Sequence, residues 1–244
     1  MRKVNLGCAI ASVLMLCACA QTPSAASKAG NEATAAEVLA KFWGAAPGSA
    51  REAMSLGLLR SIADDTTLKA AGARKPFLVS DEKYWGQLER EGYAMLQDDQ
   101  LRRVAALKLK LLQDATVDEC QAYLAGSTSG AWLGPDAEKW RRRLSRASDE
   151  DFWTWLQLSK QALLERARRI DEPAPAMTER EHNSAFATLV MSMPESIRED
   201  MFSVAARPGE PNAADVCRFA VQLLKAQTTA SGPALRIGYA TGPK

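Results

Sequence analysis

The sequence predicts an all-α fold, arranged as a multi-helix bundle or as stacked helical hairpins. Helix-capping motifs recur along the chain, and apolar residues follow them at helical spacing. Alternation of apolar and polar residues with a period of two, which is typical of half-buried strands, is absent over any useful length. Helices are therefore the expected elements from one end of the folded part to the other.

Six expected helix starts carry a capping box, in which a Ser, Thr or Asn precedes an acid by three positions. The first side chain can accept a hydrogen bond from a free amide of the first turn, and the acid accepts one from the cap's own amide. The boxes are Thr34/Glu37, Ser49/Glu52, Thr116/Glu119, Ser148/Asp151, Thr178/Glu181 and Asn212/Asp215.

Apolar stripes follow several of these starts and predict which faces are buried. The stripes are Leu101, Val104, Ala105, Leu111 and Leu112; Phe152, Trp155, Leu156, Ala162 and Leu163; Ala185, Phe186, Leu189, Val190 and Met193; and Cys217, Ala220, Val221 and Leu224.

The beginning of the chain has the layout of a secretory signal peptide. Two basic residues, Arg2 and Lys3, precede an apolar run over residues 6–16 that is too short to span a bilayer. The run ends in Leu16-Cys17-Ala18-Cys19, which resembles the lipobox of bacterial lipoproteins. The resemblance implies cleavage before Cys19, diacylglycerol on its sulfur, and acylation of the new amino terminus, with palmitate as the expected chain.

The same resemblance implies a location. Ala20, rather than Asp, follows the lipobox cysteine, and this implies an outer-membrane anchor with the folded part facing the periplasm. An alternative is that Ala18-Cys19-Ala20 serves an ordinary signal peptidase, which would release a soluble periplasmic protein beginning at Gln21.

Composition divides the chain into four parts. Residues 1–18 are the expected signal peptide, and residues 19–32, rich in Ala, Ser, Thr and Gly, are a flexible tether. Residues 33–228 form the helical domain, with a sub-boundary near residues 127–135, and residues 229–244 are expected to be a loose tail. The leader holds two of the 31 basic residues and none of the 29 acidic ones. The remaining chain is charge-balanced, which argues against nucleic acid as a partner.

Two cysteines remain once the leader is removed and Cys19 is acylated. Cys120 and Cys217 each lie in the first turn of a capped helix on its apolar side, and in an oxidising compartment they predict a disulfide. Such a bond would close a loop of about 100 residues and tie two halves together. Two buried free thiols are the alternative. The similar placing of the cysteines also fits a duplicated helical hairpin, or two helices that are merely capped in the same way.

Catalytic and metal-binding motifs are sparse. His182 is the only histidine, which excludes a His-rich metal site, and it lies next to the capping acid Glu181. The paired acids Asp64/Asp65, Asp98/Asp99 and Asp149/Glu150/Asp151 lie at helix starts, where acids are favoured structurally. We therefore expect no catalytic residue, no metal and no cofactor.

The middle of the chain holds a candidate interaction patch. Basic and aromatic side chains gather there and would suit a protein-binding surface or an anionic envelope component. The patch consists of Trp140, Arg141, Arg142, Arg143, Arg146 and Trp153. A solvated helix face balanced by neighbouring acids, with the tryptophans in the core, is the structural alternative.

These observations predict a membrane-anchored helical lipoprotein that binds or scaffolds a protein or an envelope component without catalysis. Its expected partners are membrane lipid, through acylated Cys19, and a protein. An immunity-type lipoprotein that neutralises a periplasm-targeted toxin is one alternative, and a cell-wall hydrolase or esterase is another.

Overall fold

A computed structural model describes residues 45–74, 82–120, 143–199 and 213–240. Within these ranges every regular element is a helix and there is no β-strand, so the predicted all-α class is confirmed. The predicted signal peptide, Cys19 and the tether lie outside the described residues. The duplicated-hairpin arrangement stays a prediction.

The chain separates into two compact units, each assembled from two stretches of sequence. Unit 1 consists of Met1–Gly92 and Leu144–Glu172, and unit 2 consists of Tyr93–Arg143 and Pro173–Lys244. The divisions therefore fall after Gly92, Arg143 and Glu172, while the predicted sub-boundary at residues 127–135 lies outside the described residues.

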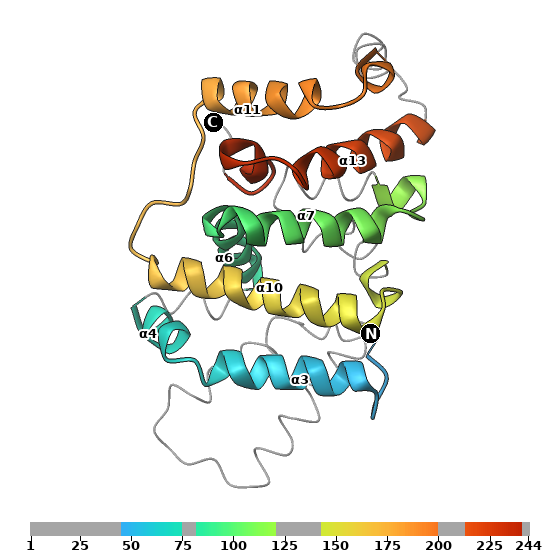
Figure 1. The fold of residues 1–244 in the computed structure, drawn as a ribbon. Helices are drawn as coiled ribbons and strands as arrows, with labels where there is room; N and C mark the ends of the chain where they lie inside the picture. The colour runs from blue at the N-terminus through green and yellow to red at the C-terminus, as the bar shows by residue number, and fades with distance from the viewer. Residues whose placement is uncertain (1–44, 75–81, 121–142, 200–212, 241–244) are drawn as a thin grey trace, which may run out of the picture. The chain divides into compact units, whose positions relative to one another are not determined.

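Unit 1 is built around one long helix. Helix α10 (Asp149–Arg168) packs against α3 (Ala50–Ala63) and α4 (Thr66–Arg74), and the unit also includes α6 (Glu82–Met95) up to Gly92. Helices α3 and α10 lie side by side and run in the same direction (Figure 1). Several side chains of these two helices are fully or almost fully buried: Leu58, Ile62, Phe152, Leu156, Ala162 and Leu163.

Unit 2 stacks three helices in alternating directions. Helix α13 (Ala213–Gln227) packs against both α7 (Asp98–Leu112) and α11 (Glu179–Met191), and it runs antiparallel to each of them (Figure 1). The short 3-10 helix η1 (Gly232–Arg236) packs on α7 and α11. Part of the core combines α11, α13 and η1 through Leu189, Met193, Ala226 and Ala234.

The predicted disulfide is present between Cys120 and Cys217, whose Cα atoms are 5.1 Å apart. Cys120 is fully buried and Cys217 is half-buried. The bond does not tie two halves of the chain together as expected, because both cysteines belong to unit 2. It instead joins the chain just after α7 to the first turn of α13.

The predicted loose tail is wrong for residues 232–240, which are firmly packed within unit 2. Leu235 and Tyr239 are buried, and the guanidinium of Arg236 donates hydrogen bonds to the carbonyl oxygens of Ala94 (3.1 Å) and Leu96 (3.1 Å). Arg236 also forms an ion pair with Asp98 at 2.9 Å. A cation with several fixed acceptors orders this segment although its apolar pattern is weak.

Asp98 completes this contact from the start of α7. Its carboxylate accepts the amide of Gly232 (2.8 Å), a residue whose φ of +58° suits glycine. This backbone hydrogen bond, followed by the one from Arg236, lowers the pKa of Asp98 below its ordinary value.

Two of the predicted capping boxes, Thr116/Glu119 and Thr178/Glu181, are confirmed in full, since the acid also accepts the amide of the capping residue. At Ser49 and Ser148 only the hydrogen bond to the capping side chain is present. The side chains of Ser49, Thr116, Ser148 and Thr178 each accept the amide hydrogen of the residue three positions on. Phe186 departs from its predicted stripe, since it is 36% exposed while Ala185 and Leu189 are buried. Thr34/Glu37 and Asn212 lie outside the described residues.

Candidate functional site

The predicted interaction patch is only partly described, and its described members belong to two different units. Trp140, Arg141 and Arg142 lie outside the described residues. Arg143 belongs to unit 2, where it is half-buried and its Nε donates to the carbonyl oxygen of Leu111 at the end of α7. Arg146 and Trp153 are exposed members of unit 1. Arg143 therefore binds the carboxyl end of α7 through this hydrogen bond, and its place in an interaction patch stays a prediction.

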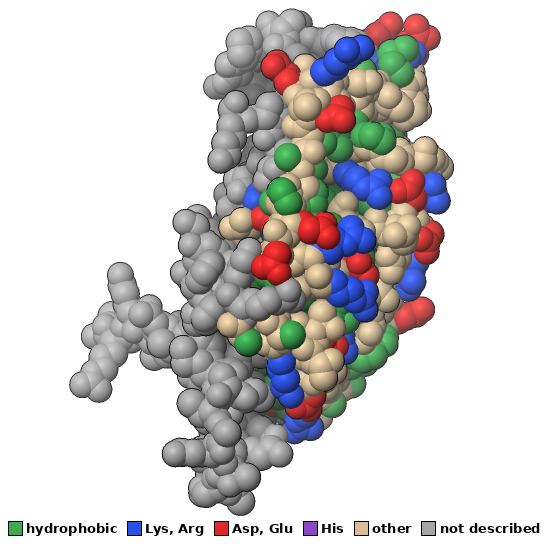
Figure 2. Space-filling view, turned by 90° about the vertical axis from the view of Figure 1, so that its left-hand side faces the viewer, with side chains coloured by type: hydrophobic (Ala, Val, Ile, Leu, Met, Phe, Trp, Pro, Cys, Tyr) green, Lys and Arg blue, Asp and Glu red, His purple; other side chains and the backbone are tan. Residues whose placement is uncertain are grey.

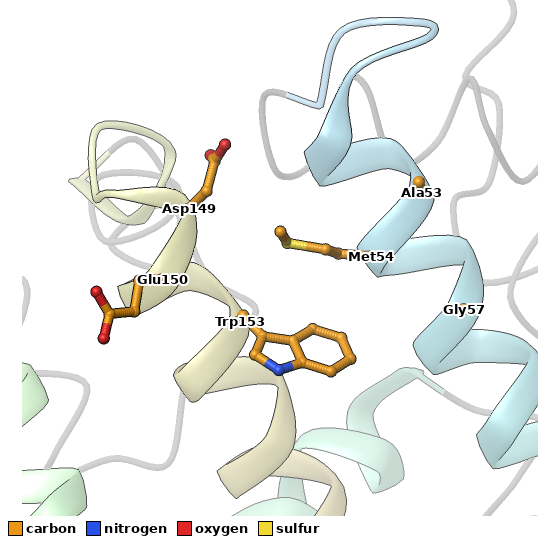
Figure 3. Close-up of a pocket in the computed structure, with 6 residues that line it drawn as sticks. All are labelled: Ala53, Met54, Gly57, Asp149, Glu150 and Trp153. Atoms are coloured by element: carbon orange, nitrogen blue, oxygen red, sulfur yellow. The ribbon is translucent and has the colours of Figure 1, made fainter.

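Trp153 instead lines a groove between α3 and α10 of unit 1. The groove has a volume of about 420 Å³, and Trp153 is 42% exposed beside it. The indole and the Met54 side chain reach toward one another between the two helices (Figure 3). The lining residues are Ala53, Met54, Gly57, Asp149, Glu150 and Trp153.

On the α3 side the groove is lined by two small, exposed residues, Ala53 and Gly57. Ala53 and Gly57 are four positions apart, so they lie one above the other on the same side of the helix. In Figure 3 they lie across the groove from Trp153. A large aromatic opposite two small residues leaves apolar surface accessible to a partner.

Arg51 fixes the two walls of the groove at one end. Its Nε donates to Asp149 Oδ1 at 2.8 Å, and its other nitrogens donate to the carbonyl oxygens of Ser145 (2.6 Å) and Ala147. The guanidinium also lies 5.1 Å from the ring centre of Phe152. This contact ties the first turn of α3 to the turn before α10, so the groove is largely preformed.

A buried ion pair holds the other end of α10. Arg166 Nε contacts Glu91 Oε2 at 2.6 Å, and the two side chains are 8% and 4% exposed. Gln87 donates to the second carboxylate oxygen (2.6 Å), and Arg166 also donates to the carbonyl oxygen of Glu172 (3.2 Å). The pair is thus well supplied with partners, as a buried charge requires.

Next to this pair, α6 and α10 approach each other closely at Gly92. A Cβ atom built on Gly92 would lie 1.9 Å from the carbonyl oxygen of Ala162. No side chain fits there, so the crossing requires glycine. Glu91, Gly92 and Arg166 therefore act together to join the two helices.

The acids considered for catalysis have structural tasks. Asp65 accepts the amides of Thr67 and Leu68 at the start of α4, at 2.8 and 3.2 Å. Asp98 binds Gly232 and Arg236, as described above, and Asp149 pairs with Arg51. These carboxylates stabilise helix starts and tertiary contacts.

His182 is half-buried on α11, one residue after the capping acid. Hydrogen bonds from the Thr178 amide and then from its hydroxyl lower the pKa of Glu181. Glu181 is thus held as an ionised cap, the role its capping box predicts. In the described ranges, no cluster of His, Cys, Asp and Glu could hold a metal ion.

Charges are interspersed on the described part of the surface drawn in Figure 2. Lys and Arg side chains alternate there with Asp and Glu, with apolar atoms between them. Among the residues that the structure describes, no helix is both long and apolar enough to cross a membrane.

The groove of unit 1 is a candidate site within the described residues. Trp153 was named from the sequence as part of a different patch, whereas Ala53, Met54 and Gly57 were not predicted. The sequence does contain a pair of small residues four positions apart in α3, Ala53 and Gly57. That pair points to a groove only once α10 is known to pack beside α3. Comparison with protein-family models, with curated proteins and with solved structures found no match to this chain.

Proposed function

We propose that this chain is a non-enzymatic binding module, held at the bacterial envelope by lipid on Cys19, which takes up a protein partner in the groove of unit 1. The groove has the features of a docking site: it is concave, its walls are tied together by Arg51, and it exposes an aromatic side chain. Tryptophan is enriched at the positions that dominate binding energy in protein interfaces.

The observation that carries the proposal is Gly57. Glycine inside a helix costs about 1 kcal/mol relative to alanine. A Cβ atom on Gly57 would meet nothing within 4 Å, in contrast to Gly92, so packing does not require glycine here. Gly57 is exposed and lines the groove, so a large side chain at this position would enter open space beside Trp153 and reduce the room for a partner.

The Cys120–Cys217 disulfide supports the envelope location. Stable disulfides are typical of exported proteins and rare in the cytosol. The signal-peptide layout at residues 1–18 and the lipobox-like residues 16–19 support the same location independently.

The anchor is tested with Cys19→Ala in the full-length precursor. Mass spectrometry of the wild-type protein should show a mature chain that begins at Cys19 and carries diacylglycerol and a fatty acyl chain. The wild-type protein should sediment with membranes, and the variant should not. An unmodified mature chain, or a variant that still sediments with membranes, would contradict the anchor.

The groove is tested by site-specific photo-crosslinking in intact envelopes. A photoreactive residue at Met54 should give a discrete protein adduct, whereas one at Met191, which is 66% exposed in unit 2, should not. Gly57→Leu should abolish the adduct by filling the groove, while the free energy of unfolding stays equal or rises. An adduct at Met54 that survives Gly57→Leu, or no adduct at all, would refute the groove as the binding site.

A further inference from the structure

We propose that the Cys120–Cys217 disulfide of unit 2 is an exchange site for thiols, at which an attacking thiolate bonds to the sulfur of Cys217 and the sulfur of Cys120 leaves. The exchange takes place in the folded protein, and it makes the bond a reversible link between the residues after α7 and the start of α13. The groove of unit 1 takes no part in this chemistry, which is therefore independent of the proposed function.

The two cysteines differ in how far a reagent can reach them. Cys120 is 0% exposed, whereas Cys217 is half-buried and is followed by the exposed Arg218. An attacking thiolate must reach one sulfur from the side opposite the other, so access decides which sulfur is attacked. In the folded protein the approach is closed at Cys120, and Cys217 is the sulfur that a thiol reaches.

Two thiol molecules carry the exchange through to the reduced protein. The first thiolate bonds to Cys217 Sγ, the Cys120–Cys217 bond breaks, and Cys120 leaves as a thiolate that takes a proton from water. The second thiolate bonds to the sulfur of the first reagent molecule, and Cys217 leaves in the same way. The reagent is oxidised to its disulfide by the loss of two electrons, and the two cysteines are reduced.

The burial of Cys120 opposes the first step and must be weighed against access. The thiolate is released beside Glu119, which is also buried, and burial disfavours a charged group. A poorer leaving group slows the exchange, but it opens no path to Cys120. We therefore expect exchange at Cys217 that is slower than exchange with a small, exposed disulfide.

The reduced form of Cys217 has hydrogen-bond acceptors in place. Its sulfur lies 3.5 Å from the carbonyl oxygen of Thr116 and 3.8 Å from that of Ala115, so a thiol at this position can donate to either as a weak donor. Helix α13 also packs against α7 and α11 along its length, apart from the bond (Figure 1). Unit 2 is therefore expected to stay folded after reduction, as a reversible link requires.

The exchange site is tested by reacting the full-length oxidised protein with excess glutathione in detergent and stopping the reaction with acid at early times. Peptide mass spectrometry reports each cysteine separately, so the lipid state of Cys19 does not affect the result. Glutathione should be found on Cys217 at least about fivefold more often than on Cys120, with the helical circular dichroism unchanged. Equal labelling, an excess on Cys120, or a bond that glutathione opens only after urea has unfolded the protein would overturn the proposal.

Cys120→Ser and Cys217→Ser form a matched pair, because each removes the same bond and leaves one of the two thiols. With glutathione disulfide as the probe, Cys217 in the first variant should be labelled at least about fivefold faster than Cys120 in the second, and in urea the two rates should become similar. Equal rates in the two folded variants would show that the fold does not select the attacked sulfur. If circular dichroism shows that either variant fails to fold, the labelling of the wild-type protein decides by itself.

Discussion

The two units are both helical, but they are closed by different kinds of contact. Unit 2 has a covalent bond between Cys120 and Cys217 and a packed terminal segment centred on Arg236. The described part of unit 1 has no disulfide, and relies on the buried pair Glu91–Arg166 and on the tight crossing at Gly92. Both of these contacts lie toward the carboxyl end of α10, while its amino end borders the groove. The carboxyl end of α10 is thus held by buried contacts, while the groove at its amino end stays open to solvent.

Removing one member of the buried pair is expected to have the largest effect. Glu91→Leu leaves Arg166 buried without a counter-ion and should lower the free energy of unfolding by about 3–5 kcal/mol, measured by urea denaturation. Glu91→Leu with Arg166→Met should recover most of the loss, because no unpaired charge remains. A double variant as unstable as the single one would show that another contact holds α6 to α10.

Removing the disulfide should have the next largest effect, confined to unit 2. Cys120→Ala with Cys217→Ala should reduce stability by about 2–5 kcal/mol, because the unfolded chain gains freedom. Hydrogen exchange should accelerate in α7 and α13 and stay unchanged in α3 and α10. Equal acceleration in both units would contradict the division into separately stabilised parts.

Substitution of Asp98 tests how much the packing of the terminal segment of unit 2 depends on the ionised carboxylate. Asp98→Asn should cost about 1 kcal/mol at neutral pH, since the side chain is partly exposed and two hydrogen bonds are weakened. The folded-state pKa is lowered, so this contribution is present above the unfolded-state value near 3.9 and is lost as the pH falls through the folded value. The difference between wild type and variant should therefore shrink below about pH 4. A difference that is constant from neutral to acidic pH would argue against an ionised Asp98.

Ser55→Ala should change the free energy of unfolding least, and it should stabilise the protein rather than destabilise it. The Ser55 hydroxyl in α3 is fully buried and has no hydrogen-bond partner among the residues that the structure describes. Its removal should raise the thermal midpoint, by a gain of about 0.5–1 kcal/mol. Ser61→Ala in the same helix is the control, because that hydroxyl donates to the carbonyl oxygen of Leu58 at 2.7 Å and its loss should not stabilise. A destabilised Ser55→Ala would reveal a partner for this hydroxyl.

Features encoded over a few neighbouring residues could be predicted from the sequence. The Thr178/Glu181 box and the buried face of α7 follow from spacing within one helix. The Cys120–Cys217 bond was predictable because few cysteines remained and the leader implied an oxidising compartment.

Contacts that depend on distant residues could not be predicted in this way. Arg51 binds Asp149, 98 positions later in the chain, and Arg236 binds Leu96, 140 positions earlier. The local sequence around each arginine does not indicate these acceptors. The groove was missed for the same reason, since Ala53 and Gly57 gain significance only from Trp153 on another helix.

The interleaving of the two units has a practical consequence for limited proteolysis. The stretch after α10 is exposed around residues 171–173 and connects unit 1 to α11. A single cut there would divide the polypeptide into a larger amino-terminal fragment with Cys120 and a smaller one with Cys217. The two fragments would migrate together on a gel until a reductant was added, so a nicked sample would pass for intact protein under non-reducing conditions.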